Sequence, residues 1–412
     1  MKKIMILGAG ILQLPAIKKA KEMGLSVIAV DMDPNAAGFA EEGIDREVIS
    51  TTDTLEVLKA AKIHGINGIM TLASDMPIRT IAVVARELGL AGVTEETALK
   101  ATNKAAMRDA LYSHSVPIPM YFKASSKEDY FKAVNEIKRH GCQCIIKPAD
   151  NSGSRGVNLL KSYEKEMVDR AYEYSKKYSR SGDLVVEEYL EGPEVSVETL
   201  SLDGECHVIQ ITDKMTTGAP YFVETGHSQP SMLPADIQLK IMEVAVAANR
   251  SIGIENGPSH TEIKVTSEGP KIIELGARLG GDNITTHLVP LSTGVNMVEC
   301  CIKIALGETP DYKTKHFKAS AIRYLESQEG VIQKIEGVQN AGKIEGIKQI
   351  SIVHGVGEHI KQVRSSVDRI GFVIAQADSA AEAMKKCENA IKEIGITYES
   401  VSYTHLTLPT IA

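Results

Sequence analysis

The first 95 residues alternate short apolar runs with stretches of helical periodicity, an order that few folds accommodate. Apolar side chains at Ile11, Leu14 and Ile17 recur at helical spacing between the first two runs. The runs read KIMILGAG, VIAVDMDP, GINGIMTLAS and GLAG. Strands that are separated by helices pair in parallel and carry helices on both faces of the sheet. We therefore expect an α/β protein whose residues 1–95 form a doubly wound parallel sheet.

Size and composition exclude several classes of protein. A chain of 412 residues exceeds what one hydrophobic core organises, so several domains are expected. The net charge of −7, without a basic block, argues against binding to nucleic acid. No run of about 18 apolar residues predicts a membrane-spanning helix. The six cysteines show neither paired zinc spacing nor a secreted disulfide framework, so we expect reduced thiols and a cytoplasmic protein.

The turn Gly8-Ala9-Gly10 is similar to the start of a dinucleotide fingerprint, and Asp31 follows 21 positions after Gly10. The third small residue of that fingerprint would fall at Gln13, which is too large for close packing of helix and strand. We therefore favour a glycine turn that serves another ligand or none. A nicotinamide site, and with it an oxidoreductase, is the alternative interpretation.

The stretch CIIKPADNSGSRGV joins a buried strand to a loop of small polar residues. Pro148 cannot continue a central ladder, so Lys147 is expected at the strand end. The loop offers glycines that permit positive φ, and amides and hydroxyls that can wrap an anion. These loop residues are Asn151, Ser152, Gly153, Ser154 and Gly156. A plain surface hairpin would have a similar composition.

Two further segments carry charges in positions that suit a nucleotide. Lys104, on a helix expected between Thr94 and Pro117, could grip a polyphosphate together with Lys147. The segment VVEEYLEGPEVSVE is an apolar strand that runs into acids, and such a hinge can face an adenine edge and ribose hydroxyls. Surface lysines and solvated acids are the alternative interpretation of these residues.

Glu262 and Glu274 interrupt the apolar runs HTEIKV and KIIELGA, which we expect to face each other in a hairpin that turns at Glu268-Gly269. Two neighbouring carboxylates repel unless a cation lies between them, and Mg²⁺ held jointly with nucleotide phosphates is the usual partner. Arg278 follows, and the turn Gly280-Gly281-Asp282 would keep its guanidinium near the metal. A pair of exposed strand acids is the alternative.

The ordered set NK, IIKP, SGSRGV, EEYLEGPEVSVE, HTEIK and IELGARLGGD resembles the ATP-grasp family over about residues 1–395. The resemblance implies a pre-ATP-grasp doubly wound sheet, then a two-lobed α+β ATP-grasp fold, then a small C-terminal α+β subdomain. The corresponding boundaries are 1–95 for the first domain, 96–116 for a helical linker, 117–192 for a lid, 193–310 for the large subdomain and 311–400 for the C-terminal subdomain. Residues 401–412, which resemble translated adapter sequence, are expected to be a non-native tail; a genuine strand is the alternative.

The resemblance also implies roles for individual residues. ATP would bind through Lys104, Lys147, the loop residues Ser152, Gly153, Ser154 and Gly156, the hinge residues Glu187, Glu188, Tyr189 and Leu190, and Glu194 at the ribose. Glu262 and Glu274 would hold Mg²⁺, with Mn²⁺ as an alternative ion, and Arg278 would act with Lys147 in catalysis. Gly276 stands where many members carry an asparagine that binds metal, which leaves the number of ions open.

The stretch TTGAPYFVETGHSQPS is similar to the substrate loop of L-amino-acid ligases, so Glu224 and His227 are candidate substrate residues together with Arg278, Gly280 and Gly281. The implied activity is ATP-dependent ligation of a small-molecule carboxylate and an amine through an acyl phosphate, with release of ADP and phosphate. A carboxylase or formyltransferase of the purine-synthesis type is the alternative within the fold, and a non-catalytic nucleotide sensor is a third. A homodimer is also expected.

Overall fold

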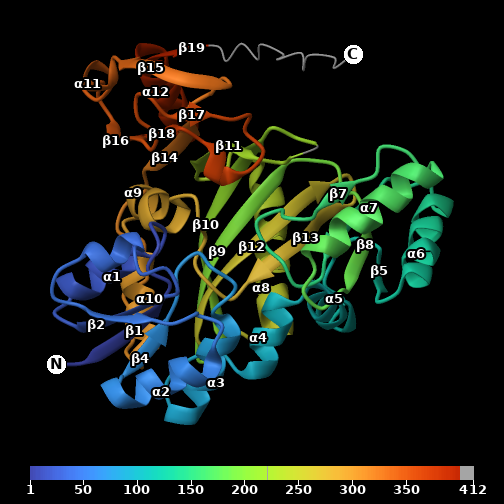
Figure 1. Ribbon diagram of the computed structural model, residues 1–412, viewed down its shortest axis with the longest axis horizontal. Coiled ribbons are helices and arrows are strands. Elements are labelled where there is room, and N and C mark those ends of the chain that lie inside the picture. The colour runs from blue at the N-terminus through green and yellow to red at the C-terminus, as the bar shows by residue number, and fades with distance from the viewer. Residues whose placement is uncertain (220, 400–412) are drawn as a thin grey trace, which may run out of the picture.

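The N-terminal sheet has four parallel strands, in the order β3-β2-β1-β4, in a computed structural model that describes residues 1–219 and 221–399 (Figure 1). The strands are β1 (Lys3–Leu7), β2 (Ser26–Asp31), β3 (Asp45–Val48) and β4 (Gly68–Met70). Helix α1 (Leu14–Glu22) packs in one core cluster with β1 and β2, while α2 (Thr54–His64) and α3 (Ile78–Leu88) pack in another. The doubly wound parallel sheet is therefore confirmed.

Two details of this domain differ from expectation. GLAG forms no strand, because Gly89 ends α3 in a left-handed conformation and an irregular segment follows. The strand that takes its place in the sheet is β3, which the apolar runs did not indicate because its sequence, DREV, is polar and largely exposed. A 3₁₀ turn at Ala37–Ala40 lies between β2 and β3.

The expected single helix between Thr94 and Pro117 is two helices, α4 (Glu95–Thr102) and α5 (Lys104–Ser113). The chain is extended at Asn103, whose side chain caps α5 by accepting from the backbone N–H of Ala106 at 3.0 Å. The backbone N–H of Lys104 donates to the carbonyl of Ala149 at 2.7 Å. This break places Lys104 at the first position of α5, against the strand-to-loop junction at Ala149.

The lid is a four-stranded antiparallel sheet in the order β5-β8-β6-β7, with a hydrophobic core of its own. Its strands are β5 (Tyr121–Ala124), β6 (Cys144–Pro148), β7 (Asn158–Leu159) and β8 (Leu184–Glu188). Two helices, α6 (Lys127–Arg139) and α7 (Lys165–Tyr178), pack against it and form the right-hand lobe in Figure 1.

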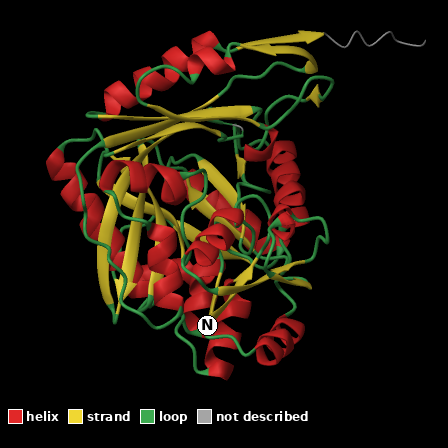
Figure 2. Ribbon diagram, turned by 90° about the vertical axis from the view of Figure 1, so that its left-hand side faces the viewer, coloured by secondary structure: helices red, strands yellow, loops and turns green. Residues whose placement is uncertain are grey.

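An eight-stranded antiparallel sheet forms the centre of the molecule, in the order β13-β12-β9-β10-β11-β14-β18-β16. Its first five strands are β9 (Glu194–Leu202), β10 (Glu205–Thr216), β11 (Glu224–Gln229), β12 (Gly257–Thr266) and β13 (Gly269–Gly276). The hairpin expected from the turn at Glu268-Gly269 is thus present, and a second hairpin, of β9 and β10, turns at Asp203-Gly204. The helices that pack on the sheet include α8 (Ala235–Ile252), α9 (Val289–Thr293), α10 (Met297–Ala305) and, at its far end, α12 (Ala380–Glu393), and Figure 2 shows helices beside the long strands.

No single helix in the described ranges is long and apolar enough to cross a bilayer. The bent pair formed by residues 284–293 and Met297–Ala305 satisfies the length and composition criteria together, but its apolar side chains lie in the core that also contains α1. A π-helical turn, Ile284–Leu288, begins this pair directly after the Gly280-Gly281-Asp282 turn.

The C-terminal part contributes the remaining strands of the large sheet and a small sheet above it. Strands β14 (Ala319–Tyr324), β16 (Ile347–Ile352) and β18 (Gly371–Ala377) continue the large sheet beyond β11. The small sheet, ordered β17-β15-β19, consists of β15 (Gly330–Glu336), β17 (His359–Ile360) and β19 (Gly395–Glu399), with α11 (Val338–Ala341) and α12 (Ala380–Glu393) beside it. The expected non-native tail, 401–412, lies outside the described residues.

Candidate functional site

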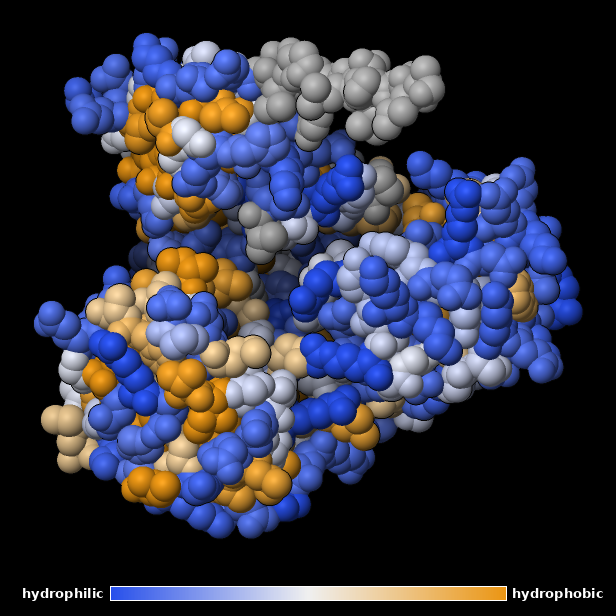
Figure 3. All heavy atoms as spheres, viewed as in Figure 1, coloured by the Kyte–Doolittle hydropathy of each residue, from blue (hydrophilic) through white to orange (hydrophobic). Residues whose placement is uncertain are grey.

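A cavity of about 360 Å³ lies where the lid, the large sheet and the N-terminal domain meet, and Figure 3 shows a hollow between these parts. Most of the residues predicted from the sequence line it. These are Lys104, Lys147, Ser152, Gly153, Ser154, Glu187, Glu188, Tyr189, Leu190, Glu194, Glu224, His227, Glu262, Glu274, Arg278 and Gly281. Gly156 and Gly280 do not border the cavity, and the binding roles expected for them stay predictions.

Glu187 forms a buried double ion pair at the lid side of the cavity. Its two carboxylate oxygens accept from Lys147 Nζ at 2.8 Å and from Arg108 Nε at 2.6 Å, and only 1% of its side chain is exposed. Burial opposes the charge, but Arg108 and Lys147 outweigh it and lower the pKa of Glu187 to about 2. The carboxylate therefore fixes two cations, whereas the sequence suggested that it would bind adenine directly.

Arg108 also joins the lid to the large sheet. Its Nη2 donates to the carbonyl of Ile273 on β13 at 2.7 Å, and its Nη1 is buried without a hydrogen-bond partner in the described part of the chain. Glu188 makes a second link at the hinge, since it accepts from the backbone N–H of Met120 at 3.1 Å and from Lys271 at 3.2 Å. Arg108 and Lys271 therefore link the end of β8, where the hinge begins, to strand β13.

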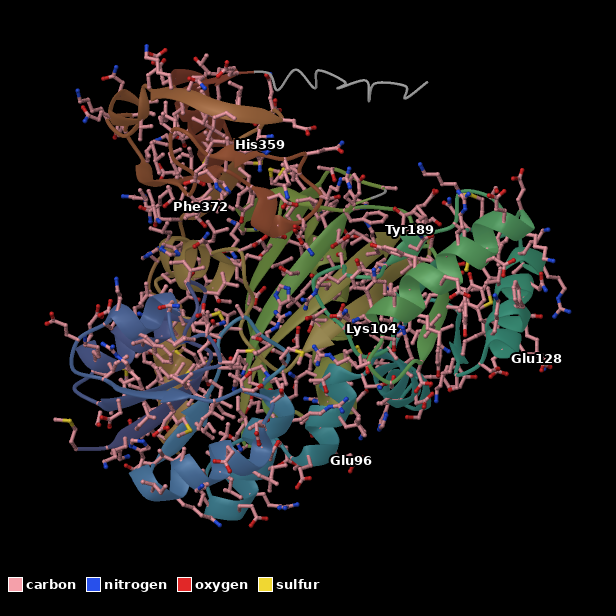
Figure 4. All side chains as sticks on the ribbon, viewed as in Figure 1. Glu96, Lys104, Glu128, Tyr189, His359 and Phe372 are labelled. Carbon is pink, nitrogen blue, oxygen red and sulfur yellow. The ribbon has the colours of Figure 1, made fainter. Side chains whose placement is uncertain are left out.

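Lys104 closes one side of the cavity (Figure 4). Its Nζ donates to the carbonyl of Asn151 in the lid loop at 2.7 Å and to Glu274 Oε1 at 2.8 Å. Glu274 lies on β13 directly opposite Glu262 on β12, as the hairpin pattern predicted. A cation, a lid carbonyl and a candidate metal carboxylate thus meet at one point.

Glu262 is paired with Lys214 of β10 at 2.8 Å, and the same ammonium contacts Glu194 at 2.8 Å. Burial raises the pKa of Glu262, but Lys214 and His260 have the larger combined effect, so that it lies well below its usual range. For Lys214, burial opposes the charge, but the two glutamates raise its pKa well above its usual value. Lys214 therefore joins the acid assigned to ribose with the acid assigned to metal.

His260 and Glu198 lie behind Glu262 in the sheet. His260 Nδ1 lies 2.7 Å from Glu198 Oε1, and Nε2 lies 3.5 Å from Glu262 Oε1. Burial lowers the pKa of His260, but Glu198 outweighs it and raises the value to about 9. A Cβ atom at Gly280 would lie 2.8 Å from Glu198 Oε2, so glycine at this position makes room for the buried carboxylate.

Arg278 is held by the N-terminal domain. Its Nε donates to Asp75 Oδ1 at 2.9 Å, and the carboxylate lies in the loop between β4 and α3. A Cβ atom at Gly276 would lie 2.8 Å from the same oxygen and 3.2 Å from Arg278 Nε. The Asp75–Arg278 pair thus occupies the space that a larger side chain at Gly276 would need.

The two facing carboxylates, Glu262 and Glu274, fit one Mg²⁺ ion. Their side chains are partly exposed to the cavity, and carboxylate oxygens are the ligands that this hard cation prefers. The described residues contain no group of three or more acidic, histidine or cysteine ligands that could enclose a metal. Phosphate oxygens and water would complete such a site, as is usual for Mg²⁺ with nucleotides.

The loop after β6 has the backbone that its glycines predicted. Gly153 and Gly156 have φ of 65° and 81°, and Ser154 has φ of 57°. A Cβ atom at Gly156 would lie 2.6 Å from Pro148 Cγ and 2.6 Å from Tyr178 Cβ, whereas one at Gly153 would meet nothing within 4 Å. Gly156 therefore packs the base of the loop, while Gly153 lines the cavity.

At the opposite end, the C-terminal part reaches the cavity through Ser366, and it also holds Asp282 of the cavity wall through Arg369. Its guanidinium donates to both oxygens of Asp282, at 2.7 and 2.9 Å, and its Cζ lies 3.7 Å from the centre of the Tyr324 ring. His227, which is 1% exposed, has Nε2 at 3.4 Å from Asp282, and Ser366 donates to Glu224 at 3.1 Å. The two candidate substrate residues are thus positioned by groups far away in sequence.

The Gly8-Ala9-Gly10 turn is filled from within the protein. Gln13 is buried, donates to the carbonyl of Leu72 at 2.5 Å, and lies where a Cβ atom at Gly8 would come within 3.0 Å of it. Asp31 accepts from the backbone N–H of Ala9 at 2.8 Å. The space and the acid that a dinucleotide would need are already in use, which argues against the oxidoreductase.

Comparison with protein families accounts for this arrangement. Residues 140–286 match the ATP-grasp domain, and residues 323–399 match the L-amino acid ligase C-terminal domain 2. The chain contains an ATP-grasp domain. The family expected from the sequence motifs is thereby confirmed, and the ATP-grasp match contains the lid loop, the hinge, the facing acids and Arg278.

Relatives of this chain include two amino acid ligases and a phosphoribosylamine–glycine ligase. Alanine–anticapsin ligase of Bacillus subtilis (strain 168) is 29% identical over 60% of this chain and 56% of its own length. L-arginine-specific L-amino acid ligase of Bacillus subtilis is 24% identical over 86% of this chain and 83% of its own. Phosphoribosylamine–glycine ligase of Methanocaldococcus jannaschii (strain ATCC 43067 / DSM 2661 / JAL-1 / JCM 10045 / NBRC 100440) is 24% identical over 95% and 94%.

Solved structures show the same fold. An L-amino acid ligase from Bacillus licheniformis superposes with a TM-score of 0.82 at 22% identity, covering 97% of this chain and 99% of that one. Phosphoribosylglycinamide synthetase from Anaerococcus prevotii gives 0.78 at 23% identity, with coverage of 97% and 100%. The biotin carboxylase domain of a Hydrogenobacter thermophilus carboxylase, a dimer in complex with MgADP, gives 0.76 at 19% identity, with coverage of 96% and 91%.

Four side chains that organise the cavity were not predicted from the sequence. Arg108 could have been found, because it lies four positions after Lys104 on the same helix face. Lys214 lies on a strand whose register could not be fixed before the sheet was known. Asp75 and Arg369 act on partners 203 and 87 positions away, and no local pattern indicates such pairs.

Proposed function

We propose that this ATP-grasp ligase activates a small-molecule carboxylate as an acyl phosphate and transfers the acyl group to an amine, releasing ADP and phosphate. The observation that carries the proposal is that the groups for a nucleotide, a metal and an acid all line one cavity. The hinge, Lys147 and Lys104, the facing acids Glu262 and Glu274, and Arg278 with the substrate loop border it, and Lys104 contacts Glu274. This arrangement suits a nucleotide whose terminal phosphate points at Arg278.

Lys147 and Lys104 would bind the phosphates of ATP, and each is held ready by an acid in the absence of nucleotide. Glu194 would accept from ribose, and the hinge from Glu188 to Leu190 would border the base. Glu262 and Glu274 would hold Mg²⁺, which, when bound, neutralises charge on the phosphoryl oxygens. The loop from Ser152 to Gly156 would then cover the phosphates and exclude water.

The reaction needs no nucleophile from the protein. In the first step a carboxylate oxygen attacks the γ-phosphorus, a new O–P bond forms, and the bond to the β-phosphate oxygen breaks so that ADP leaves. In the second step the nitrogen lone pair attacks the acyl carbon, a C–N bond forms, and the C–O bond breaks with its electron pair leaving on phosphate; the amine proton passes to water. Lys147 and Arg278 would stabilise the charge that develops on phosphoryl and acyl oxygens.

An amino acid is the acid substrate that the site supports best. His227 and Glu224 line the far end of the cavity with Arg278 and Gly281, so the acid would lie among one cation and several polar groups. Residues 323–399 match a C-terminal domain of L-amino acid ligases, and two of the relatives named above are amino acid ligases. A purine-synthesis activity is the alternative, because phosphoribosylamine–glycine ligase aligns over nearly the whole chain.

Capture of the acyl phosphate tests the proposal. Purified protein is incubated with ATP, Mg²⁺, hydroxylamine and single amino acids, and the expected products are a hydroxamate and ADP. The Arg278→Ala variant should give less hydroxamate, because it lacks charge where the acyl phosphate develops. AMP as the main nucleotide product would contradict the mechanism, and so would the absence of hydroxamate with every acid.

The identity of the substrate pair and the homodimer are two further proposals. A screen of all pairs of amino acids for phosphate release, compared with the rate for the acid alone, would identify the substrates. The homodimer would be tested by size-exclusion chromatography with light scattering, and a monomer at micromolar concentration would contradict it.

A further inference from the structure

A buried acid and a buried histidine lie side by side in the large sheet, next to the facing acids. Glu198 on β9 is directly opposite His260 on β12, and Glu262 follows two positions along β12, so all three side chains lie on one face of the sheet. Glu198 is 0% exposed and His260 is 6% exposed. Ionisable side chains are rarely buried so completely, and this pair lies beside the candidate metal site.

His260 joins two carboxylates. Its Nδ1 lies 2.7 Å from Glu198 Oε1, and its Nε2 lies 3.5 Å from Glu262 Oε1. Each ring nitrogen thus faces one carboxylate. A half-turn of the ring would put carbon atoms in both places, so the two contacts fix its orientation.

Glu262 is held through only one of its oxygens. Lys214 Nζ lies 2.8 Å from Oε1, the same oxygen that faces His260. Among the residues that the structure describes, none forms a hydrogen bond or ion pair with Glu262 Oε2. The side chain is 26% exposed and borders the cavity. One oxygen is therefore anchored in the sheet, while the other is available to a cation.

Gly280 leaves the space that this pair needs. A Cβ atom there would lie 2.7 Å from His260 Nδ1 and 2.8 Å from Glu198 Oε2, and the φ of Gly280 is not positive, so space rather than backbone conformation requires the glycine. Glu198 Oε2 is buried without a hydrogen-bond partner in the described part of the chain. Such an oxygen costs stability, and a buried ion pair adds little, so stability does not account for the pair.

We propose that Glu198 and His260 are positioning residues for Mg²⁺ binding, which hold Glu262 Oε1 against the sheet and leave Oε2 for the metal. Glu198 orients the ring of His260, and the ring orients the carboxylate together with Lys214. Both residues act through Glu262 and not by contact with the metal. Partners behind a metal ligand commonly change metal affinity by about 10- to 100-fold. This inference rests on the proposed function, which assigns Glu262 to Mg²⁺.

The test measures metal binding instead of turnover. Mn²⁺ is titrated into protein saturated with ADP, free Mn²⁺ is followed by electron paramagnetic resonance, and a titration of ADP without protein is subtracted. His260→Asn has an amide near the place of Nδ1 but none near Nε2, whereas His260→Gln has one near Nε2. The dissociation constant of Mn²⁺ should rise at least about tenfold in His260→Asn and less in His260→Gln.

Two variants disturb the pair without removing the histidine. Glu198→Gln lacks the charge that orients the ring, and Gly280→Ala places a methyl group against both members of the pair. Both should weaken Mn²⁺ binding. If His260→Asn does not fold, because Glu198 is left as a buried charge without a partner, the uncharged double variant Glu198→Gln/His260→Asn takes its place.

Two controls separate positioning from a general effect on the fold. His207→Asn changes a histidine of β10 that stacks on Tyr312 and does not border the cavity, and it should bind Mn²⁺ as the wild type does. The affinity for ADP in EDTA, measured by isothermal titration calorimetry, should stay at the wild-type value in every variant, because the pair acts only on the metal.

The variant Glu262→Gln separates failure of this inference from failure of the proposed function. Wild-type Mn²⁺ affinity in His260→Asn and Gly280→Ala, together with weak binding in Glu262→Gln, would overturn the inference alone. So would an equal loss of ADP affinity in EDTA, since it would show a general disturbance of the site. Wild-type Mn²⁺ affinity in Glu262→Gln would contradict the metal assignment itself, and the inference would fall with it.

Discussion

The functional side chains of this protein are held in ion pairs with other residues of the chain. Lys104 is paired with Glu274, Lys147 with Glu187, and Arg278 with Asp75. Buried pairs of this kind add little net stability, but they hold each group in one place. Nucleotide binding then exchanges one anionic partner for another, so that little reorganisation is needed at the moment of reaction.

Replacement of Lys147 tests this view at the level of one residue. Lys147→Ala should remain folded, because Glu187 keeps its contact with Arg108, but it should bind ATP at least about tenfold more weakly. Isothermal titration calorimetry with ATP measures the change. Lys161→Ala, at an exposed lysine of the lid, is the control and should bind as the wild type. Equal affinity of Lys147→Ala and wild type would contradict the assignment.

Glu187 predicts a dependence of stability on pH. Folding lowers its pKa from 4.5 to about 2, so the unfolded chain takes up the proton more readily than the folded chain. Its stabilising contribution is therefore complete above pH 4.5 and is lost as the pH falls toward 2. Glu187→Gln should be less stable by about 3 kcal/mol at pH 7, because Arg108 and Lys147 lose their counter-ion.

Urea unfolding at a series of pH values provides the measurement. The difference between wild type and Glu187→Gln should narrow below pH 4.5, since only the wild-type side chain can titrate. A difference that stays constant down to pH 3 would show that Glu187 is not the titrating group.

At the scale of single residues, sequence reasoning found the groups that interrupt a regular pattern. Glu262 and Glu274 stood out because each breaks an apolar run, and the hairpin brings them opposite each other. Arg369 gave no such signal, because its meaning depends on Asp282 in another part of the fold. Asp75 could not be assigned for the same reason.

Among the elements, the apolar runs predicted three strands of the N-terminal sheet and the hairpin that turns at Glu268-Gly269. Errors arose where a short polar segment gains its structure from neighbours, as β3 does, or where one capping residue divides a helix. Asn103 is such a residue, since an extended backbone there ends α4 and begins α5. A continuous helical pattern on both sides concealed the break.

The lid loop supplies a prediction at the scale of the element. Gly156→Ala should destabilise the lid for two reasons: alanine is strained at the positive φ of this position, and its methyl group would collide with Pro148 and Tyr178. Gly153→Ala has only the strain of the positive φ, because its methyl group would meet no atom within 4 Å. Trypsin cleavage after Arg155 should accordingly be fastest in Gly156→Ala, and MgATP should slow it in the wild type by holding the loop closed. Equal rates in the two variants would show that packing at Gly156 does not restrain the loop.

At the scale of the whole molecule, the eight-stranded sheet passes from the ATP-grasp lobe into the C-terminal part. Strand β11 pairs with β10 on one side and with β14 on the other, so the boundary expected near residue 311 separates segments of sequence but not separate sheets. The C-terminal strands also carry Tyr324, whose ring supports Arg369. The end of the cavity that contains the candidate substrate residues is therefore positioned by side chains from the C-terminal part of the chain.

Truncation tests this dependence. A chain ending at Lys318 should be insoluble or lack a cooperative thermal transition, because β11 is left with an open edge and Arg369 is gone. A chain ending at Glu399 removes none of the described strands and should melt as the full-length protein does. A soluble, cooperatively folded 1–318 fragment would show that the ATP-grasp lobe is independent.

Synthesis on the ribosome adds a consequence of this shared sheet. Strand β11 ends about 90 residues before β14 begins, and polypeptides are extended at roughly 5–20 residues per second. The nascent chain therefore presents the open edge of β11 for several seconds before β14 is translated. Synonymous codon changes that slow translation between Gln229 and Ala319 should therefore lower the yield of folded protein without changing the finished enzyme.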